Sequence, residues 1–277
     1  MVAQTSLVSR VALYTLLVVV LGVMLFPFFE LAATALRPTA DLFAFPPPWL
    51  PTRPRFHNFI DVWRIIPLRS YFVNTVEIAG GTMLLNAVAA IPAAYALARF
   101  RFPGRQAVLY VVIATQMFAP VVLLIASFRL MSQLGLLNSL WGLILMDAAT
   151  TVPFTVWMLT GYFAALPREI EEAAILDRVG RWRRLFDLFI PLSMPGIVTA
   201  LVFTFILAWN EFLFAVTFVT DDSKRPLTAG LYTFVGRFST QWNYLMAGSA
   251  MASIPVLLLF LVIQRRLIAG LTAGAVK

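Results

Sequence analysis

Six stretches of this 277-residue sequence are almost free of charge and long enough to cross a lipid bilayer as helices. A spanning helix needs about 20 mainly apolar residues, since its backbone must satisfy its own hydrogen bonds inside the hydrocarbon. Charged residues make up 12% of the chain, against about a quarter in a soluble domain. We predict an all-α polytopic membrane protein with one transmembrane domain, 1–277, whose six transmembrane helices cover about 11–34, 71–98, 107–129, 140–165, 196–219 and 247–264.

The charges between these stretches predict the orientation of the chain. Residues 37–69 are too polar and too rich in proline to span, and we expect them to form an extracytoplasmic loop. The run 11–29 exceeds the roughly 7–15 apolar residues of a signal peptide, so we interpret it as an uncleaved span. Six spans place both termini on one side, which carries 12 basic residues against 9 on the other. The positive-inside rule therefore predicts cytoplasmic termini.

Several function classes lack the residues that they need. The chain has no cysteine and one histidine, His57, so thiol chemistry and histidine clusters for metals are excluded. The net charge of +8 comes from short basic clusters between apolar stretches, which is typical of membrane topology and not of a nucleic-acid binder. No G-x-x-x-x-G-K-[ST] motif occurs, so this chain has no P-loop for ATP.

The segment 166–195 is too charged to span and too rich in helix formers to be a plain loop. Acidic residues cluster after Pro167, which suits a first helical turn, and arginines come later, as the helix dipole favours. We expect a small, flat helix face, and Gly180 as the break before a second short helix. The residues of this face, at i, i+3, i+4 and i+7, are Ile170, Ala173, Ala174 and Asp177. These residues alone fit either an amphipathic surface helix or a docking element.

Four motifs, in order along the chain, resemble those of ABC importer permeases of the carbohydrate uptake type. Within 166–195, Glu172-Ala173-Ala174 is followed by Asp177 and by Ile190-Pro191, which is similar to the EAA loop of that family. The chain also carries the similar motifs Ala93-Ala94-Tyr95-Ala96-Leu97-Ala98-Arg99, Trp209-Asn210-Glu211-Phe212 and the C-terminal segment 264–277. The chain as a whole resembles the six-span permease of maltose-type, binding-protein-dependent importers.

The resemblance implies a type I ABC importer permease fold with a cytoplasmic coupling helix in the loop 166–195. It also implies a bacterial or archaeal cytoplasmic (inner) membrane, a second and different permease subunit, two cytoplasmic ATPase subunits and an extracytoplasmic sugar-binding protein. ATP and Mg would be bound by the ATPases, with no cofactor and no enzymatic activity in this chain. The residues that would couple to the ATPases are Glu171, Glu172, Ala173, Ala174, Asp177 and Gly180. The sequence departs from the family at Arg178-Val179, where Gly-Ala is usual, and Gly180 is the candidate to form the turn instead.

Trp209, Asn210 and Glu211 are candidates for the substrate pathway. A carboxylate within a span is costly unless it faces water or a partner group. Asn210 and Glu211 could therefore line the path and bond sugar hydroxyls, or could lock this chain to the second permease subunit. Asp147 and Glu77 lie near the ends of their spans, where we expect them to reach toward the interface.

The resemblance implies import of a disaccharide or oligosaccharide, with a glycerol-phosphate-type ABC permease as the alternative. A proton-coupled secondary transporter would need several ionisable residues within its spans and internal repeats, and we detect neither. An intramembrane enzyme would need facing His, Asp or Ser/Lys groups, which the sequence lacks.

Overall fold

The computed structural model describes residues 7–46 and 48–273, with the side chains of 10–46 and 48–264. Within these residues the chain is helical, with no strand beyond one isolated bridge between Val235 and Thr240, so the prediction of an all-α fold is confirmed. Pro47 of the proline-rich loop and residues 274–277 of the C-terminal motif lie outside the described residues. The chain divides into two compact units, one containing the chain up to Ile66 with Leu231–Ile254, the other Pro67–Gly230 with the chain from Pro255 onward.

The first unit contains the N-terminal helix and the proline-rich loop. Its elements are α1 (Leu7–Leu36), α2 (Thr39–Leu42), α3 (His57–Ile65), the 3-10 turn η3 (Tyr232–Phe234) and the beginning of α14 (Trp242–Ala273). Arg37 donates to the Glu30 carboxylate at 2.7 Å and to the carbonyls of Pro48 and Trp49. Asn58 donates to the carbonyls of Ala35 and Arg37. The segment expected to be a loop at 37–69 therefore carries two short helices and a network of internal hydrogen bonds.

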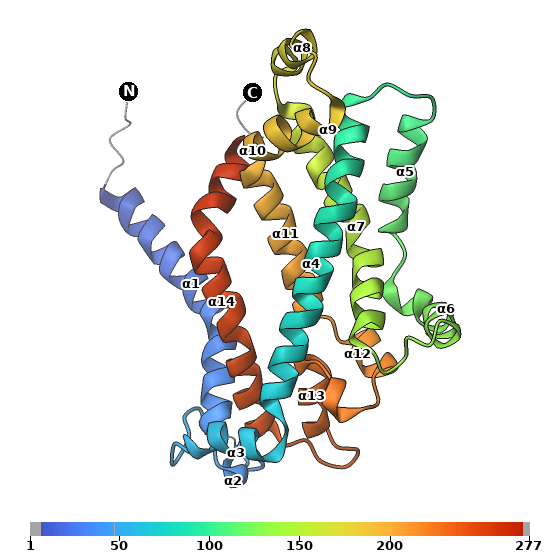
Figure 1. The fold of residues 1–277 in the computed structure, drawn as a ribbon. Coiled ribbons are helices and arrows are strands. Elements are labelled where there is room, and N and C mark those ends of the chain that lie inside the picture. The colour runs from blue at the N-terminus through green and yellow to red at the C-terminus, as the bar shows by residue number, and fades with distance from the viewer. Residues whose placement is uncertain (1–6, 47, 274–277) are drawn as a thin grey trace. The chain divides into compact units, whose positions relative to one another are not determined.

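The second unit is built around a bundle of three long helices, α4, α7 and α11, which pack against one another (Figure 1). Its elements are α4 (Leu68–Arg99), α5 (Arg105–Thr115), α6 (Pro120–Gln133), α7 (Leu140–Ala165), α8 (Arg168–Leu176), α9 (Arg181–Arg184), the π-helical turn η1 (Leu185–Phe189), α10 (Ile190–Leu192), α11 (Met194–Trp209), α12 (Leu213–Phe218), the 3-10 turn η2 (Asp222–Lys224) and most of α13 (Leu227–Leu231). Small residues on α4, such as Ala79, Ala90 and Ala94, are fully buried and let these helices approach closely.

A buried polar layer separates two apolar clusters along the three-helix bundle. Asn86 of α4 donates to the hydroxyl oxygens of Thr151 and Thr155 on α7 and of Thr204 on α11, at 2.9, 3.2 and 3.0 Å. The hydroxyls of Thr151 and Thr204 in turn donate to carbonyls four residues earlier in their own helices. An unpaired amide in an apolar interior costs several kcal/mol, so this network fixes the register of the three helices.

Two of the expected spans are not continuous helices. The expected span 107–129 is divided between α5 and α6, which meet at an angle of 97°, and Pro120 begins α6. The expected span 196–219 ends its long helix at Trp209, and α12 follows after a break. Across the described residues, α1, α4, α7 and α14 are long and apolar enough to cross a membrane alone. The number reaches six if each of two bent pairs, α5 with α6 and the helical stretch Arg181–Leu192 with α11, crosses as one span.

Candidate coupling site

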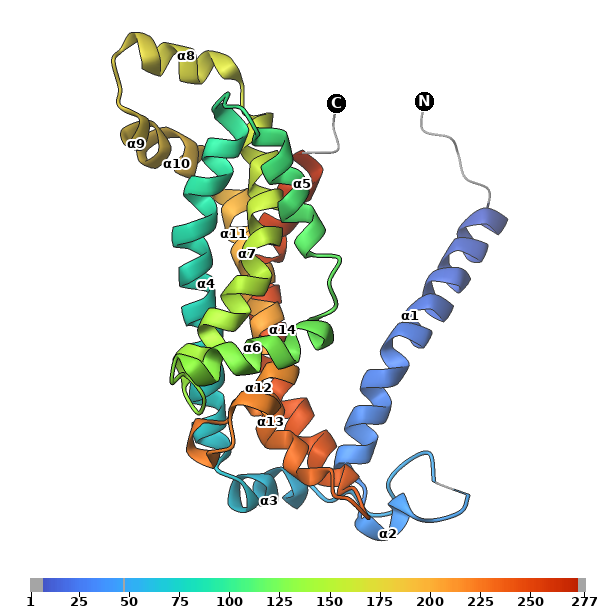
Figure 2. The ribbon, with the colours of Figure 1, turned by 90° about the vertical axis from the view of Figure 1, so that its right-hand side faces the viewer.

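The charged segment 166–195 begins with a short helix, α8, at one end of the second unit, beside the ends of α4 and α7 (Figures 1 and 2), and continues through α9, η1 and α10. Pro167 precedes it in an extended conformation, and Glu169 and Glu171 lie in its first turn, where the helix dipole stabilises negative charge. The helix contains nine residues, too few to be stable alone in water. Its position therefore depends on contacts with the rest of the unit.

Glu171 provides the main polar contact between α8 and the bundle. Its carboxylate lies 3.3 Å from Arg184 and 3.8 Å from Arg99, and the three side chains are only 14%, 9% and 4% exposed. One carboxylate is thus shared by two arginines at a site that water barely reaches. Removal of one member of such a buried group leaves an uncompensated charge, which costs far more than loss of a surface pair.

Arg99 connects this cluster to two further elements. Its Nη2 atom donates to the carbonyls of Phe163 and Leu166, at 2.6 and 2.7 Å, at the C-terminal end of α7. A helix leaves its last carbonyls without partners, and a cation there also complements the helix dipole. The guanidinium carbon lies 4.9 Å from the centre of the Phe189 ring. Arg99 and Glu171 thus join the ends of α4, α7 and η1 to α8.

The exposed face of α8 differs from the expected one. Ala174 is 6% exposed and Ile170 is half-buried, so these two members of the expected face point toward the unit. Ala173 and Asp177 are exposed as expected. The exposed face is shifted by one residue from the expected face, because Glu171 and Ala174 pack against the rest of the unit. The side chains that α8 presents outward, at i, i+3, i+4 and i+7, are Glu169, Glu172, Ala173 and Leu176.

The turn after α8 forms at Arg178 and not at Gly180, but Gly180 does lie directly before a second short helix, α9, as expected. Arg178 has φ 57°, in the left-handed region, whereas Gly180 has an ordinary extended backbone. The amide of Val179 donates to the carbonyl of Ala174 and the amide of Arg178 to that of Ile175, both at 2.9 Å. These two bonds define a Schellman motif, whose left-handed position is normally occupied by glycine.

Trp209, Asn210 and Glu211 form the break between α11 and α12. Trp209 is buried and stacks on Phe205, with ring centres 5.5 Å apart. Asn210 is exposed, and its amide donates to a carbonyl of its own helix. The Glu211 carboxylate accepts from the amides of Phe214 and Ala215, at 2.7 and 2.9 Å, and so caps the start of α12. Neither sequence-based interpretation of Glu211, a pathway wall or an intersubunit lock, included this intrachain cap.

Asp147 does not reach toward the interface, as expected from the sequence, but is 2% exposed within α7. Neither oxygen of its carboxylate has a hydrogen-bond partner among the described residues. Glu77 is exposed, as a residue near the end of its span was expected to be. The sequence also gave no role to Asn86 or to the pairing of Arg99 and Arg184 with Glu171. Asn86, a polar residue within an apolar stretch, was the available signal. Its partners, however, lie on other helices.

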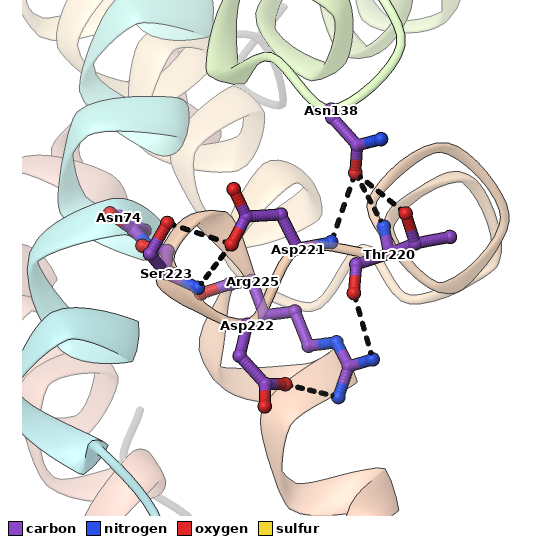
Figure 3. Close-up of polar contacts among 7 residues, drawn as sticks. All are labelled: Asn74, Asn138, Thr220, Asp221, Asp222, Ser223 and Arg225. Atoms are coloured by element: carbon purple, nitrogen blue, oxygen red, sulfur yellow. Dashed lines mark hydrogen bonds and ion pairs between the residues drawn. The ribbon is translucent and has the colours of Figure 1, made fainter.

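The opposite end of the second unit carries an ordered polar loop (Figure 3). Asn138, with φ 53°, accepts from the amides of Thr220 and Asp221, at 2.7 and 3.0 Å. Asn74 donates to the carbonyls of Ser223 and Arg225, both at 2.9 Å. Hydrogen bonds from the amide and hydroxyl of Ser223 hold the pKa of Asp221 below its usual value. Side chains from α4 and from the turn before α7 thus fix the loop 219–226.

Known proteins resemble this chain over almost its whole length. It is 32% identical over 274 residues to a probable ABC transporter permease protein of Bacillus subtilis, YurM, covering 98% of this chain and 89% of that protein. It is 34% identical to the diacetylchitobiose uptake system permease protein DasC of Streptomyces coelicolor, covering 99% of both chains. A solved bacterial ABC transporter, involved in import of the acidic polysaccharide alginate, has a chain with the same fold. That chain matches with a TM-score of 0.80 at 22% identity, over 94% of this chain and 98% of its own length.

The family assignment follows from the match to a family model. The model for the inner membrane component of binding-protein-dependent transport systems matches residues 86–272, which include α8, the turn at Arg178 and the break at Glu211. This agrees with the resemblance that the motifs indicated, with the helical fold and with the apolar spans. The chain belongs to the family of inner membrane components of binding-protein-dependent transport systems and is an ABC transporter permease.

Proposed function

We propose that this permease is a subunit of an ATP-driven sugar importer, in which it forms half of the translocation pathway with a second, different permease subunit. The substrate that we propose is a disaccharide or an oligosaccharide. Support comes from the relative in Streptomyces coelicolor, which is named for diacetylchitobiose uptake, and from the fold shared with a transporter of alginate. A binding protein outside the membrane would deliver the sugar to the end of the unit that carries the loop 219–226.

We further propose that α8 is the coupling helix and docks onto one of two cytoplasmic ATPase subunits, which bind ATP and Mg. The observation that carries this proposal is the buried Glu171 cluster. Because Arg99 holds α8 to the ends of α4 and α7, and Arg184 holds it to α9, a displacement of α8 would move these elements as a rigid body. The exposed face formed by Glu169, Glu172, Ala173 and Leu176 would enter the ATPase surface. Leu176, 84% exposed, would be its apolar contact. This arrangement requires α8 and both termini to be cytoplasmic.

The proposal is tested by purifying the tagged chain with its native partners and reconstituting the complex in proteoliposomes. ATP hydrolysis is then measured with the binding protein and a panel of sugars, including maltose, trehalose, chitobiose-type and raffinose-type saccharides, with glycerol 3-phosphate as the competing substrate class. We expect two ATPases and a second permease to co-purify. We also expect one saccharide to stimulate ATP hydrolysis, and to do so only when the binding protein is present. Stimulation by glycerol 3-phosphate and by no saccharide would refute the substrate class. Co-purification without any ATPase would refute the coupling role.

A further inference from the structure

Arginines surround a polar pocket of 220 Å³ between α8 and the segment that joins α4 to α5. The pocket is lined by Arg99, Arg101, Arg105 and Arg168, with two carboxylates, those of Glu171 and Glu172. Glu171 already compensates Arg99. No ion pair forms to Arg101, Arg105 or Arg168 among the described side chains. The buried Nε atom of Arg105 also has no hydrogen-bond partner there. The pocket therefore carries excess positive charge and unused donors, which suits an anion.

An apolar groove of 420 Å³ runs along the same end of α5 and α7. Its walls include Leu109 and Ile113 on α5 and Trp157, Met158 and Gly161 on α7. These two helices lie side by side in both views of the fold (Figures 1 and 2). A Cβ atom added at Gly161 would meet no other atom within 4 Å, so the groove is open at this point.

The groove and the arginine pocket are lined by consecutive residues at the start of α5. Gln106 lines the groove, and the residue before it, Arg105, lines the pocket. Both features lie where apolar helices give way to a charged segment, which is the depth of lipid phosphates in a bilayer. An apolar slot that ends at guanidinium groups matches one kind of molecule, an amphiphile with a long hydrocarbon chain and a phosphate head.

We propose that the pocket and the groove together bind one anionic phospholipid. Its phosphate would bond to Arg101 and Arg105, since the planar guanidinium matches phosphate oxygens in paired hydrogen bonds. One acyl chain would lie in the groove between α5 and α7. A zwitterionic lipid is disfavoured, because its ammonium group would add positive charge to a pocket in which four arginines outnumber two carboxylates. Through Arg168 the bound lipid would also contact α8, so the lipid would support the position of this helix.

Native mass spectrometry of the purified complex, released from nanodiscs of dioleoylphosphatidylglycerol or dioleoylphosphatidylcholine, tests the proposal. We expect wild type to retain phosphatidylglycerol and not phosphatidylcholine. Arg105→Gln should lower retention at least fivefold. The matched control Arg183→Gln removes one charge from an exposed arginine, which lies in the same segment as α8 but outside the pocket, and should change retention less than twofold. Equal retention by Arg105→Gln and Arg183→Gln would overturn the proposal.

A second variant distinguishes a lipid from a soluble anion. Gly161→Leu places a side chain in the groove at a point where its Cβ atom meets no neighbour, and it should lower phosphatidylglycerol retention at least fivefold, whereas Gly22→Leu, on α1, should not. Inorganic phosphate should not compete with the lipid. If phosphate displaces the lipid and Gly161→Leu has no effect, the pocket binds a free anion and the lipid assignment fails. Because the chain has no cysteine, Gly161→Cys carries a unique thiol. Its crosslinking to another subunit of the complex would show that protein fills the groove, which would also overturn the proposal.

Discussion

Arg178 adopts a backbone conformation that glycine adopts at lower cost. A left-handed residue other than glycine costs about 1 kcal/mol or more, because its Cβ atom approaches a carbonyl oxygen. The Schellman bonds of Val179 and Arg178 hold the turn in spite of this cost. Arg178 is exposed and forms no ion pair among the described side chains, so no ion pair offsets the cost.

Arg178→Gly is therefore expected to stabilise the turn by about 0.5–1 kcal/mol, while Arg178→Val should destabilise it because β-branched side chains tolerate positive φ worst. Hydrogen exchange of the amides around residues 173–180 measures this, and Arg178→Gly should slow exchange about two- to fivefold. Faster exchange in Arg178→Gly than in wild type would contradict the assignment of the turn to Arg178.

Glu171 is the residue on which the attachment of α8 depends most. We expect Glu171→Ala to lower the free energy of unfolding by about 3 kcal/mol, because it leaves the buried guanidiniums of Arg99 and Arg184 without a carboxylate. Denaturant unfolding of the purified complex measures the change. Arg184→Ala in the same chain should recover part of the loss.

The control for Glu171→Ala is Asp187→Ala, which breaks the exposed pair of Arg183 and Asp187. A surface pair of this kind contributes less than about 1 kcal/mol. Equal effects of Glu171→Ala and Asp187→Ala would mean that the cluster around Glu171 does not hold α8.

At the scale of elements, the break between α11 and α12 depends on a single carboxylate. Glu211 accepts two backbone amides of α12, and its own carbonyl accepts the hydroxyl of Thr228 at 2.5 Å. A helix of six residues depends strongly on such a cap. Because α12 contributes Phe214 and Phe218 to an apolar cluster with α7, loss of the cap would loosen both elements.

Glu211→Ala should weaken α12 by about 1–2 kcal/mol and should lower transport more than assembly of the complex. Glu211→Gln retains one acceptor oxygen and should show a smaller effect on both. Hydrogen exchange of α12 and transport per assembled complex measure the two quantities. If exchange in α12 is unchanged while transport falls, the carboxylate acts on the substrate pathway and not as a cap.

At the scale of the whole molecule, α8 stands between the spanning helices and the proposed ATPase partner. Glu172 lies on its exposed face and, unlike Glu171, forms no ion pair among the described side chains. We expect Glu172→Lys to leave membrane insertion intact while abolishing ATPase docking and transport, since it reverses a charge on the docking face. Asp187→Lys makes the same charge change at an exposed site outside α8 and should retain both activities. Normal assembly and wild-type transport in Glu172→Lys would refute the coupling assignment.

The sequence by itself determined the class of fold, the family and the approximate location of the charged segment that carries α8. Hydropathy, charge and the EAA motif are local properties of the chain, and they persist whatever the neighbouring helices do. The same patterns identified Trp209, Asn210 and Glu211 as an exception within an apolar stretch. The orientation of the termini and the roles of the site residues stay predictions.

Only the tertiary structure decided which side of α8 faces outward, where the turn forms and what Glu211 bonds. The contacts of a nine-residue helix with its neighbours determine which side faces outward. Here Glu171 pairs with arginines from α4 and from the segment after α8, and Ala174 is buried on the same side. Asn86 meets Thr204, a residue 118 positions away in the sequence. No local pattern encodes such a pairing, because it exists only once the helices pack and a buried polar group must find its partner.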